Sequence, residues 1–260
     1  MLLKIENLSV SYNNIKVLDN VNLSIEKGQC VGLVGESGCG TTTAGLSITK
    51  LIPEHKGKVS SGKILLEGED LLKLDPEALR KIRGKKVSYV FQEPFSSLNP
   101  VFTIYDQLKE CFSEKKDVDQ LIADILKRVG LDKIIGKTKL YPHELSGGMQ
   151  QRVVIAMAIA SQPDLLILDE PTTALDVTVQ KQILDLIVGL KENMGLSILY
   201  ISHDLRTVFN VSDSVSVMYA GRVIEDGPKK DIVSRPSHPY TKGLIASIPS
   251  FGHRKKRFNA

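Results

Sequence analysis

The chain has 260 residues, of which 42% are hydrophobic and 25% charged, the composition of an ordinary globular protein large enough to bury a core. Its 34 Lys and Arg exceed its 30 Asp and Glu by four. That excess lies in one cluster near the C-terminus, made of Arg254, Lys255, Lys256 and Arg257. The rest of the chain is balanced in charge, which excludes the broad basic face that duplex nucleic acid requires.

Membrane-spanning and disulfide-bonded classes are also disfavoured. No run approaches the roughly eighteen consecutive apolar residues of a spanning helix, and residues 1–6 lack the features of a secretory signal. Cys30, Cys39 and Cys111 form neither a CxxC pair nor an even-numbered framework, which is typical of a reducing cytosol. We therefore expect any work at a membrane to be done through a partner.

Strand-like and helix-like segments alternate along the chain, which predicts an α/β protein with a mainly parallel sheet. Strands are expected at 17–25, 30–34, from 63, at 165–169, 197–201 and 214–219. Helices are expected at 41–52, from Pro76 behind an Asp75 cap, and at 177–194. Residues 104–161 are expected to be largely helical, with an apolar stripe formed by Val118, Leu121, Ile122, Ile125 and Val129.

A glycine-rich loop, Gly35-Glu36-Ser37-Gly38-Cys39-Gly40-Thr41-Thr42, joins an apolar strand to a helix. That context fits a P-loop, whose glycines let backbone N–H groups surround phosphate oxygens at a helix N-terminus. The motif requires Gly-x4-Gly-Lys-Ser/Thr, and Thr41 stands at the lysine position, while Thr42 still offers a hydroxyl for Mg²⁺. By itself the loop is either a phosphate site or a tight structural turn.

Two acids end another apolar strand, at Asp169 and Glu170. Acids are common where a strand meets solvent. In a phosphate-binding protein, however, Asp169 would reach the Mg²⁺ shell and Glu170 would orient or deprotonate a water.

Four further features each have a structural alternative. The segment 145–150, Leu-Ser-Gly-Gly-Met-Gln, is either a helix cap or a second anion-binding helix start. Gln92 and His203 follow strand-like runs, where a surface amide and a structural histidine are ordinary. Tyr12 belongs to the core or stacks on a base. Their joint order along the chain is not accidental.

In this order the motifs resemble those of an ATP-binding cassette (ABC) ATPase over nearly the whole chain. The matching parts are the Walker A loop at 35–42, the Q-loop at Gln92, the signature at 145–150, Walker B through Asp169 and Glu170, the D-loop at 174–176, and the switch His203. The resemblance implies a P-loop NTPase fold with a RecA-like core, an antiparallel β subdomain and an inserted helical subdomain. The ATPase domain would span 1–235, with its helical subdomain at about 93–160, and residues 236–260 would form a C-terminal extension with a basic tail.

Subfamily detail comes from Gln92-Glu93-Pro94-Phe95-Ser96-Ser97-Leu98-Asn99-Pro100 and from His238-Pro239-Tyr240-Thr241. Both look like segments of the dipeptide, oligopeptide and nickel importer group. The resemblance implies a subunit that energises uptake of peptides, nickel or metal chelates. Members of that group often carry a cysteine-containing extension; none follows here, so no iron–sulfur cluster is expected.

The resemblance also implies ATP and Mg²⁺ as cofactors and assigns roles by position. Tyr12 would stack on adenine. Glu170, His203 and Gln92 would be the catalytic set, and Thr42, Gln92 and Asp169 would serve Mg²⁺. The phosphates would be cradled by Gly35, Glu36, Ser37, Gly38, Cys39, Gly40, Thr41, Thr42 and Thr43. The nucleotide of a partner would be contacted by Ser146, Gly147, Gly148 and Gln150.

The partners implied are a second ABC ATPase subunit, identical or different, packed head to tail, and two membrane permease subunits. An extracellular substrate-binding protein would act indirectly, and no nucleic acid is expected. The chain would be peripheral, at the cytoplasmic face of the cell membrane. The cluster at 254–257 is either a solvated end or a segment attracted by anionic lipids.

Thr41 is the main departure from the family pattern. A lysine there makes charge-assisted phosphate contacts worth roughly 1.5–3 kcal/mol each, so nucleotide binding and hydrolysis should be impaired. No Lys or Arg lies between Lys27 and Lys50 to replace it. An engineered change in an active subunit and a natural degenerate site beside a competent partner both explain it. Alternative functions are a non-catalytic regulatory subunit and a soluble ABC ATPase without a permease.

Overall fold

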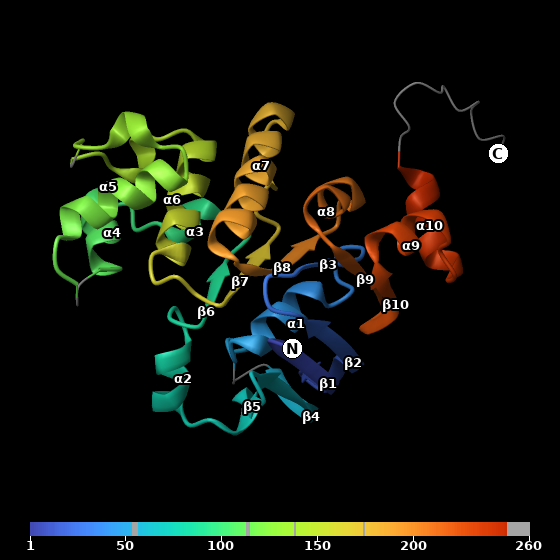
Figure 1. Ribbon diagram of the computed structural model, residues 1–260. Coiled ribbons are helices and arrows are strands. Elements are labelled where there is room, and N and C mark those ends of the chain that lie inside the picture. Colours follow the sequence, from blue (N-terminus) through green and yellow to red (C-terminus); the bar gives the residue numbers. More distant parts are fainter. Residues whose placement is uncertain (54–56, 113–114, 138, 174, 249–260) are drawn as a thin grey trace.

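The computed structural model describes residues 1–53, 57–112, 115–137, 139–173 and 175–248. In this part of the chain two β-sheets lie beside a group of helices, with further helices at the C-terminal side (Figure 1). No helix among these residues is long and apolar enough to cross a bilayer. The cluster at 254–257 and Ala174 of the D-loop lie outside the described residues.

The smaller sheet has the strand order β2-β1-β4-β5 and is antiparallel throughout. Its strands are β1 (Leu3–Tyr12), β2 (Ile15–Ile25), β4 (Gly57–Leu66) and β5 (Glu69–Asp70). Asn13 and Asn14 join β1 to β2 with positive φ angles of 48° and 67°, the backbone of a tight hairpin turn. The sequence predicted neither β1 nor the early start of β4.

The larger sheet has the order β10-β9-β3-β8-β7-β6, and only β10 is antiparallel to its neighbour. Its strands are β3 (Cys30–Val34), β6 (Val87–Val90), β7 (Leu165–Asp169), β8 (Ser197–Ser202), β9 (Ser214–Tyr219) and β10 (Arg222–Pro228). All residues of β3, β7 and β8 are buried, as expected for parallel strands covered on both faces.

Two apolar cores sandwich this sheet because successive side chains of a strand point to opposite faces. On β7, Leu166 and Leu168 join the core on the side of the helices. Leu165 and Ile167 join the core shared with the antiparallel sheet and with α1 (Thr41–Ile48). The parallel strands are therefore held from both sides, and their carboxyl ends are placed at one edge.

The helical group, coloured green to yellow in Figure 1, stands apart from α1. It contains α3 (Pro94–Ser97), α4 (Ile104–Glu110), α5 (Val118–Arg128), α6 (Gly147–Ile159) and the 3-10 turns η2 (Asp132–Ile134) and η3 (Pro142–Glu144). The predicted stripe on α5 is confirmed, since Ile122, Ile125 and Val129 are buried and Val118 and Leu121 pack against the same core. The prediction of a largely helical 104–161 is also confirmed.

The remaining helices flank the two sheets. They are α2 (Pro76–Ile82), α7 (Val177–Met194), α8 (Leu205–Val211), α9 (Lys229–Ser234) and α10 (Pro239–Ser247), with η1 (Leu71–Lys73) before α2. Asp75 caps α2 as predicted, accepting from the N–H of Ala78. The predicted end of α1 at residue 52 is wrong, because Thr49 caps the helix and Lys50 takes a φ of 52°.

Candidate functional site

The loop 35–40 leaves β3 and enters α1, where two of its glycines are required by close contacts. A Cβ on Gly35 would lie 2.4 Å from the carbonyl oxygen of Met218. Gly40, the N-cap of α1, has a φ of 105°, and a Cβ there would lie 2.7 Å from Leu18 Cδ2. Between them Glu36, Ser37 and Gly38 are exposed. The loop therefore folds tightly and presents its outer residues to solvent.

The start of α1 supplies donors for an anion. The first bond of its backbone ladder runs from the N–H of Ala44 to the carbonyl of Gly40, at 2.9 Å. The N–H groups of Thr42 and Thr43 precede that ladder, as in the first turn of any helix. Together with the partial positive charge of a helix N-terminus, they fit a phosphate group.

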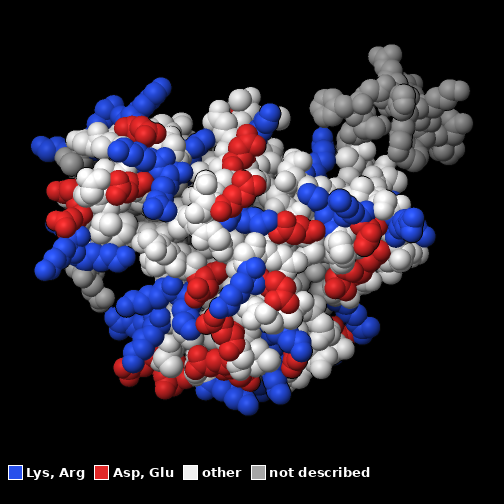
Figure 2. All heavy atoms as spheres, in the orientation of Figure 1, with Lys and Arg blue, Asp and Glu red and all other residues white. Residues whose placement is uncertain are grey.

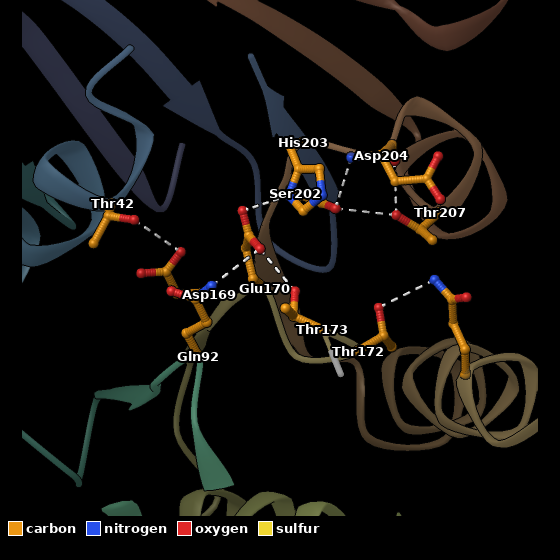
Figure 3. Close-up of polar contacts among 11 residues, drawn as sticks. Thr42, Gln92, Asp169, Glu170, Thr172, Thr173, Ser202, His203, Asp204 and Thr207 are labelled. Atoms are coloured by element: carbon orange, nitrogen blue, oxygen red, sulfur yellow. Dashed lines mark hydrogen bonds and ion pairs between the residues drawn. The ribbon is translucent and has the colours of Figure 1, made fainter. Parts of the chain in front are cut away.

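Asp169 ends β7 directly beside the start of α1. Its Oδ1 accepts from the Thr42 hydroxyl at 3.2 Å, as Figure 3 shows. Its Oδ2 accepts from the Tyr89 hydroxyl at 2.8 Å. Burial raises the pKa of Asp169, and the bonds from Tyr89 and Thr42 act in the opposite direction. A carboxylate hydrogen-bonded to a threonine hydroxyl offers oxygen ligands of the kind that Mg²⁺ prefers.

Glu170 follows at once, with a φ of 48° that turns its side chain away from the strand. Its Oε1 lies 2.7 Å from His203 Nδ1, at the end of β8. Its Oε2 accepts from the Thr173 hydroxyl at 2.7 Å and from Gln92 Nε2 at 3.3 Å, as Figure 3 shows. The three residues expected to be catalytic are thus brought together from the ends of three parallel strands.

The segment 145–150 lies in the helical group. Ser146 caps α6 by accepting from the Met149 N–H at 3.4 Å. Ser146 is exposed and Gly147 is half-buried. Gly148 is buried against α7, where a Cβ would lie 2.4 Å from Val179 Cγ1. Small residues therefore let this end of α6 approach α7 closely.

Gln150 points into the protein, in contrast to the expected position beside a nucleotide. Only 1% of the residue is exposed. Its Nε2 donates to the carbonyl oxygens of Pro142 at 2.7 Å and Leu145 at 3.2 Å. The structure therefore uses Gln150 to hold the loop that carries Ser146.

Tyr12 ends β1, opposite Ile15 on one side and Gly57 on the other. The residue is half-buried and packs against the core of the antiparallel sheet. A Cβ on Gly57 would lie 2.8 Å from Tyr12 Cε1, so the ring lies across that glycine. The residue remains partly open to solvent.

Tyr89 and Thr173 are two residues of this site that the sequence reasoning missed. Tyr89 lies inside the apolar strand β6, and its ring reaches Asp169 past Gly45 of α1, where a Cβ would lie 3.1 Å from the Tyr89 hydroxyl. The available signal was the hydroxyl itself, because a tyrosine in a buried strand requires a hydrogen-bond partner. Nothing comparable distinguished Thr173 from other threonines.

The loop, the acidic pair and the polar residues around it define a nucleotide-binding protein of the P-loop class. Residues 18–173 match the family described as ABC transporter, and residues 224–260 match the oligopeptide/dipeptide transporter C-terminal region. The chain belongs to the ABC transporter family, as an ATP-binding protein of the oligopeptide and dipeptide transporter group. Both the predicted α/β P-loop fold and the predicted family are confirmed.

Among its relatives is the dipeptide transport ATP-binding protein DppD of Bacillus subtilis, 43% identical over 95% of this chain and 77% of the relative. The oligopeptide transport ATP-binding protein OppD of the same organism is 42% identical over 96% of this chain and 72% of its own length. Among solved structures, cbiO1 from Clostridium perfringens, part of the ABC transporter complex cbiONQ, superposes with a TM-score of 0.80 at 28% identity over 90% and 91% of the two chains. The cassette MJ0796, in a dimeric post-hydrolysis state bound to ADP and Pi, gives 0.76 at 28% identity over 88% and 99%.

Proposed function

We propose that the chain is the ATP-binding and ATP-hydrolysing subunit of an importer, with peptides as its cargo class. The observation that carries this proposal is the meeting of the loop 35–43 with two acidic residues at one sheet edge. There Thr42 reaches Asp169, and Glu170 lies between Gln92 and His203. The names of the relatives favour peptides over the nickel or metal chelates that the group also transports.

The roles follow from the contacts at this edge. The N–H groups at the start of α1 would hold the phosphates, and the ring of Tyr12 would stack on the base. Thr42 and Asp169 would hold Mg²⁺, with Gln92 nearby; the ion supplies charge neutralisation on the phosphate oxygens. Glu170 would orient a water and accept its proton, while His203 keeps the carboxylate in place.

A second cassette is part of the proposal because the signature lies away from the loop of its own chain. Among the described residues Ser146, Gly147 and Gly148 make no hydrogen bond to residues 35–43. Ser146 and Gly147 are accessible at the helix start of α6, where they can face a nucleotide bound by another subunit. The dimeric MJ0796 cassette supports this arrangement.

Contact with membrane permease subunits would place the chain at the cytoplasmic face of the cell membrane. Phe91, Val101 and Phe102 are exposed by 43%, 73% and 48% beside the Q-loop residue Gln92 and α3. These exposed apolar side chains lie on either side of α3 in the sequence, and exposed apolar surface of this kind is typical of a partner contact. An extracellular substrate-binding protein would act on the permease and only indirectly on this chain.

Thr41 lowers the expected activity of this chain's own site. The lysine that the motif requires is absent, and Asp169 is satisfied by two hydroxyls. The threonine at the lysine position also favours a second candidate function, in which the chain binds nucleotide and regulates assembly of the transporter without hydrolysing ATP.

The test is co-expression with the two permease subunits and the second cassette encoded beside it. We expect co-purification, ATP turnover in membranes, and loss of this chain's share of turnover in Glu170→Gln. The matched control is Glu110→Gln, which removes an exposed carboxylate at the end of α4. Failure to associate with any permease would refute the importer proposal, and association with turnover untouched by Glu170→Gln would support the regulatory one.

A further inference from the structure

The C-terminal region contacts the phosphate loop directly, through a residue of the His238-Pro239-Tyr240-Thr241 motif. The hydroxyl of Tyr240, on α10, accepts a hydrogen bond from the backbone N–H of Glu36 at 3.3 Å, across 204 positions of sequence. The ring of Tyr240 also packs on the ring of Tyr219 at the end of β9, with centroids 4.5 Å apart and planes tilted by 44°. Figure 1 shows α10 beside β9 and β10.

The turn between β9 and β10 holds the same loop from another side. The N–H of Gly221 donates to the carbonyl of Cys39 at 3.0 Å. The carbonyl of Met218 touches Gly35 so closely that no side chain fits there. Both ends of the stretch 35–39 are therefore packed on this turn, and Tyr240 contacts the exposed residue between them.

The position of Tyr240 is fixed by a set of hydrogen bonds between Glu225 on β10 and residues 237–240, called the anchor below. On β10 the carboxylate of Glu225 accepts from the N–H groups of Ser237 at 2.6 Å and His238 at 3.0 Å. His238 Nδ1 then accepts from the N–H of Tyr240 at 3.1 Å and caps α10. Thr241 is fully buried. These bonds fix the backbone at the start of α10, and so orient the Tyr240 side chain toward the phosphate loop.

We propose that residues 236–248 act as an outer clamp on the phosphate loop and that Tyr240 is a positioning residue for nucleotide binding. This rests on the proposed function, in which the loop 35–43 binds the phosphates. A glycine-rich loop loses much conformational freedom when it closes on a ligand, so a contact that orders it beforehand strengthens binding. Because position 41 has no lysine, phosphate binding depends on the N–H groups of the loop and on the metal. The positions of those N–H groups therefore affect the affinity more than they would beside a lysine.

The test uses the full chain with Tyr240→Phe, which removes the hydroxyl and keeps the ring packed on Tyr219. Binding of fluorescent MgADP is titrated, and amide hydrogen exchange is followed over residues 35–39 without nucleotide. We expect a dissociation constant raised about two- to tenfold, the range of one hydrogen bond, and faster exchange of the Glu36 amide. The matched control is Tyr219→Phe, whose hydroxyl makes no hydrogen bond to the loop among the described residues.

A third variant, Glu225→Gln, weakens the anchor without changing a residue of the loop. Like Tyr240→Phe, it should raise the dissociation constant for MgADP and speed the exchange of the Glu36 amide. Unchanged binding and exchange in Tyr240→Phe would overturn the clamp, and so would equal effects of Tyr219→Phe. If neither this chain nor Thr41→Lys binds nucleotide, the proposed function fails. The exchange of the Glu36 amide still decides the clamp in that case.

Discussion

Replacing Thr41 by lysine tests the chemistry of the site most directly. Position 41 is the first residue of α1, one residue before the Thr42 that reaches Asp169. An ammonium placed there would lie where the helix start already favours negative charge, and near two carboxylates that have no Lys or Arg partner among the described residues. Restoring it therefore adds the missing cation of the phosphate site.

The magnitude follows from the contacts restored. One charge-assisted hydrogen bond to a phosphate is worth about 1.5–3 kcal/mol, which corresponds to about tenfold to hundredfold in nucleotide affinity. Negative charge on the transferring phosphoryl group is also stabilised, so turnover should rise by about 10²–10³, the scale of a recovered oxyanion donor. The gain should be larger in turnover than in affinity.

The assay measures nucleotide affinity by fluorescence and ATP turnover with the same partner subunits in membranes. Thr41→Met is the matched control because it adds an unbranched side chain without charge. We expect gains for Thr41→Lys and none for Thr41→Met. Equal turnover of the lysine variant and the present chain, or an equal gain with methionine, would refute the reasoning.

Three further outcomes are expected. Tyr89→Phe removes the donor on Asp169 Oδ2, so the Mg²⁺ concentration that half-saturates nucleotide binding should rise about tenfold, with no change in Tyr219→Phe. Gln150→Leu removes a donor from two carbonyls, of which Pro142 keeps the bond from the Leu145 N–H, and should lower the free energy of unfolding in urea by about 1–3 kcal/mol. Gly148→Ala forces α6 off α7 at a similar cost, and adding Val179→Ala should recover most of it.

Several strands and helices in and around the larger sheet could be predicted from the sequence, because at these positions the local sequence pattern agrees with the tertiary structure. The bounds of β3, α7 and β9 match the expected ranges. The reason is that β3 is a continuous apolar run after a turn, and α7 is capped by Asp176 at its start and Gly195 at its end. The β1 strand alternates apolar and polar residues at 3–6 and again at 8–12, but the alternation is interrupted at Asn7, which takes a φ of 51°. The register with both pairing partners shifts at the same place, so the local pattern reads as two short pieces and not as one strand.

The residues of the site could be predicted from sequence motifs, but several of the contacts between them could not. The positions of Asp169, Glu170, Gln92 and His203 follow from the rule that parallel strands end at one edge. Tyr89 and Tyr240 could not be placed in this way, because each acts from an element whose own sequence is explained by packing. Their contacts depend on the tertiary structure, which places β6 next to β7 and α10 next to the phosphate loop.

The two tyrosines lead to one conclusion about how this site is held without a lysine. Asp169 keeps its orientation through two hydroxyl donors, and the loop keeps its shape through backbone contacts to the β9–β10 turn and Tyr240. None of these supports depends on a cation, so the fold of the loop does not require the missing ammonium. The ammonium would add positive charge beside the phosphates, so we expect Thr41 to weaken nucleotide binding and hydrolysis while leaving the architecture of the site unchanged.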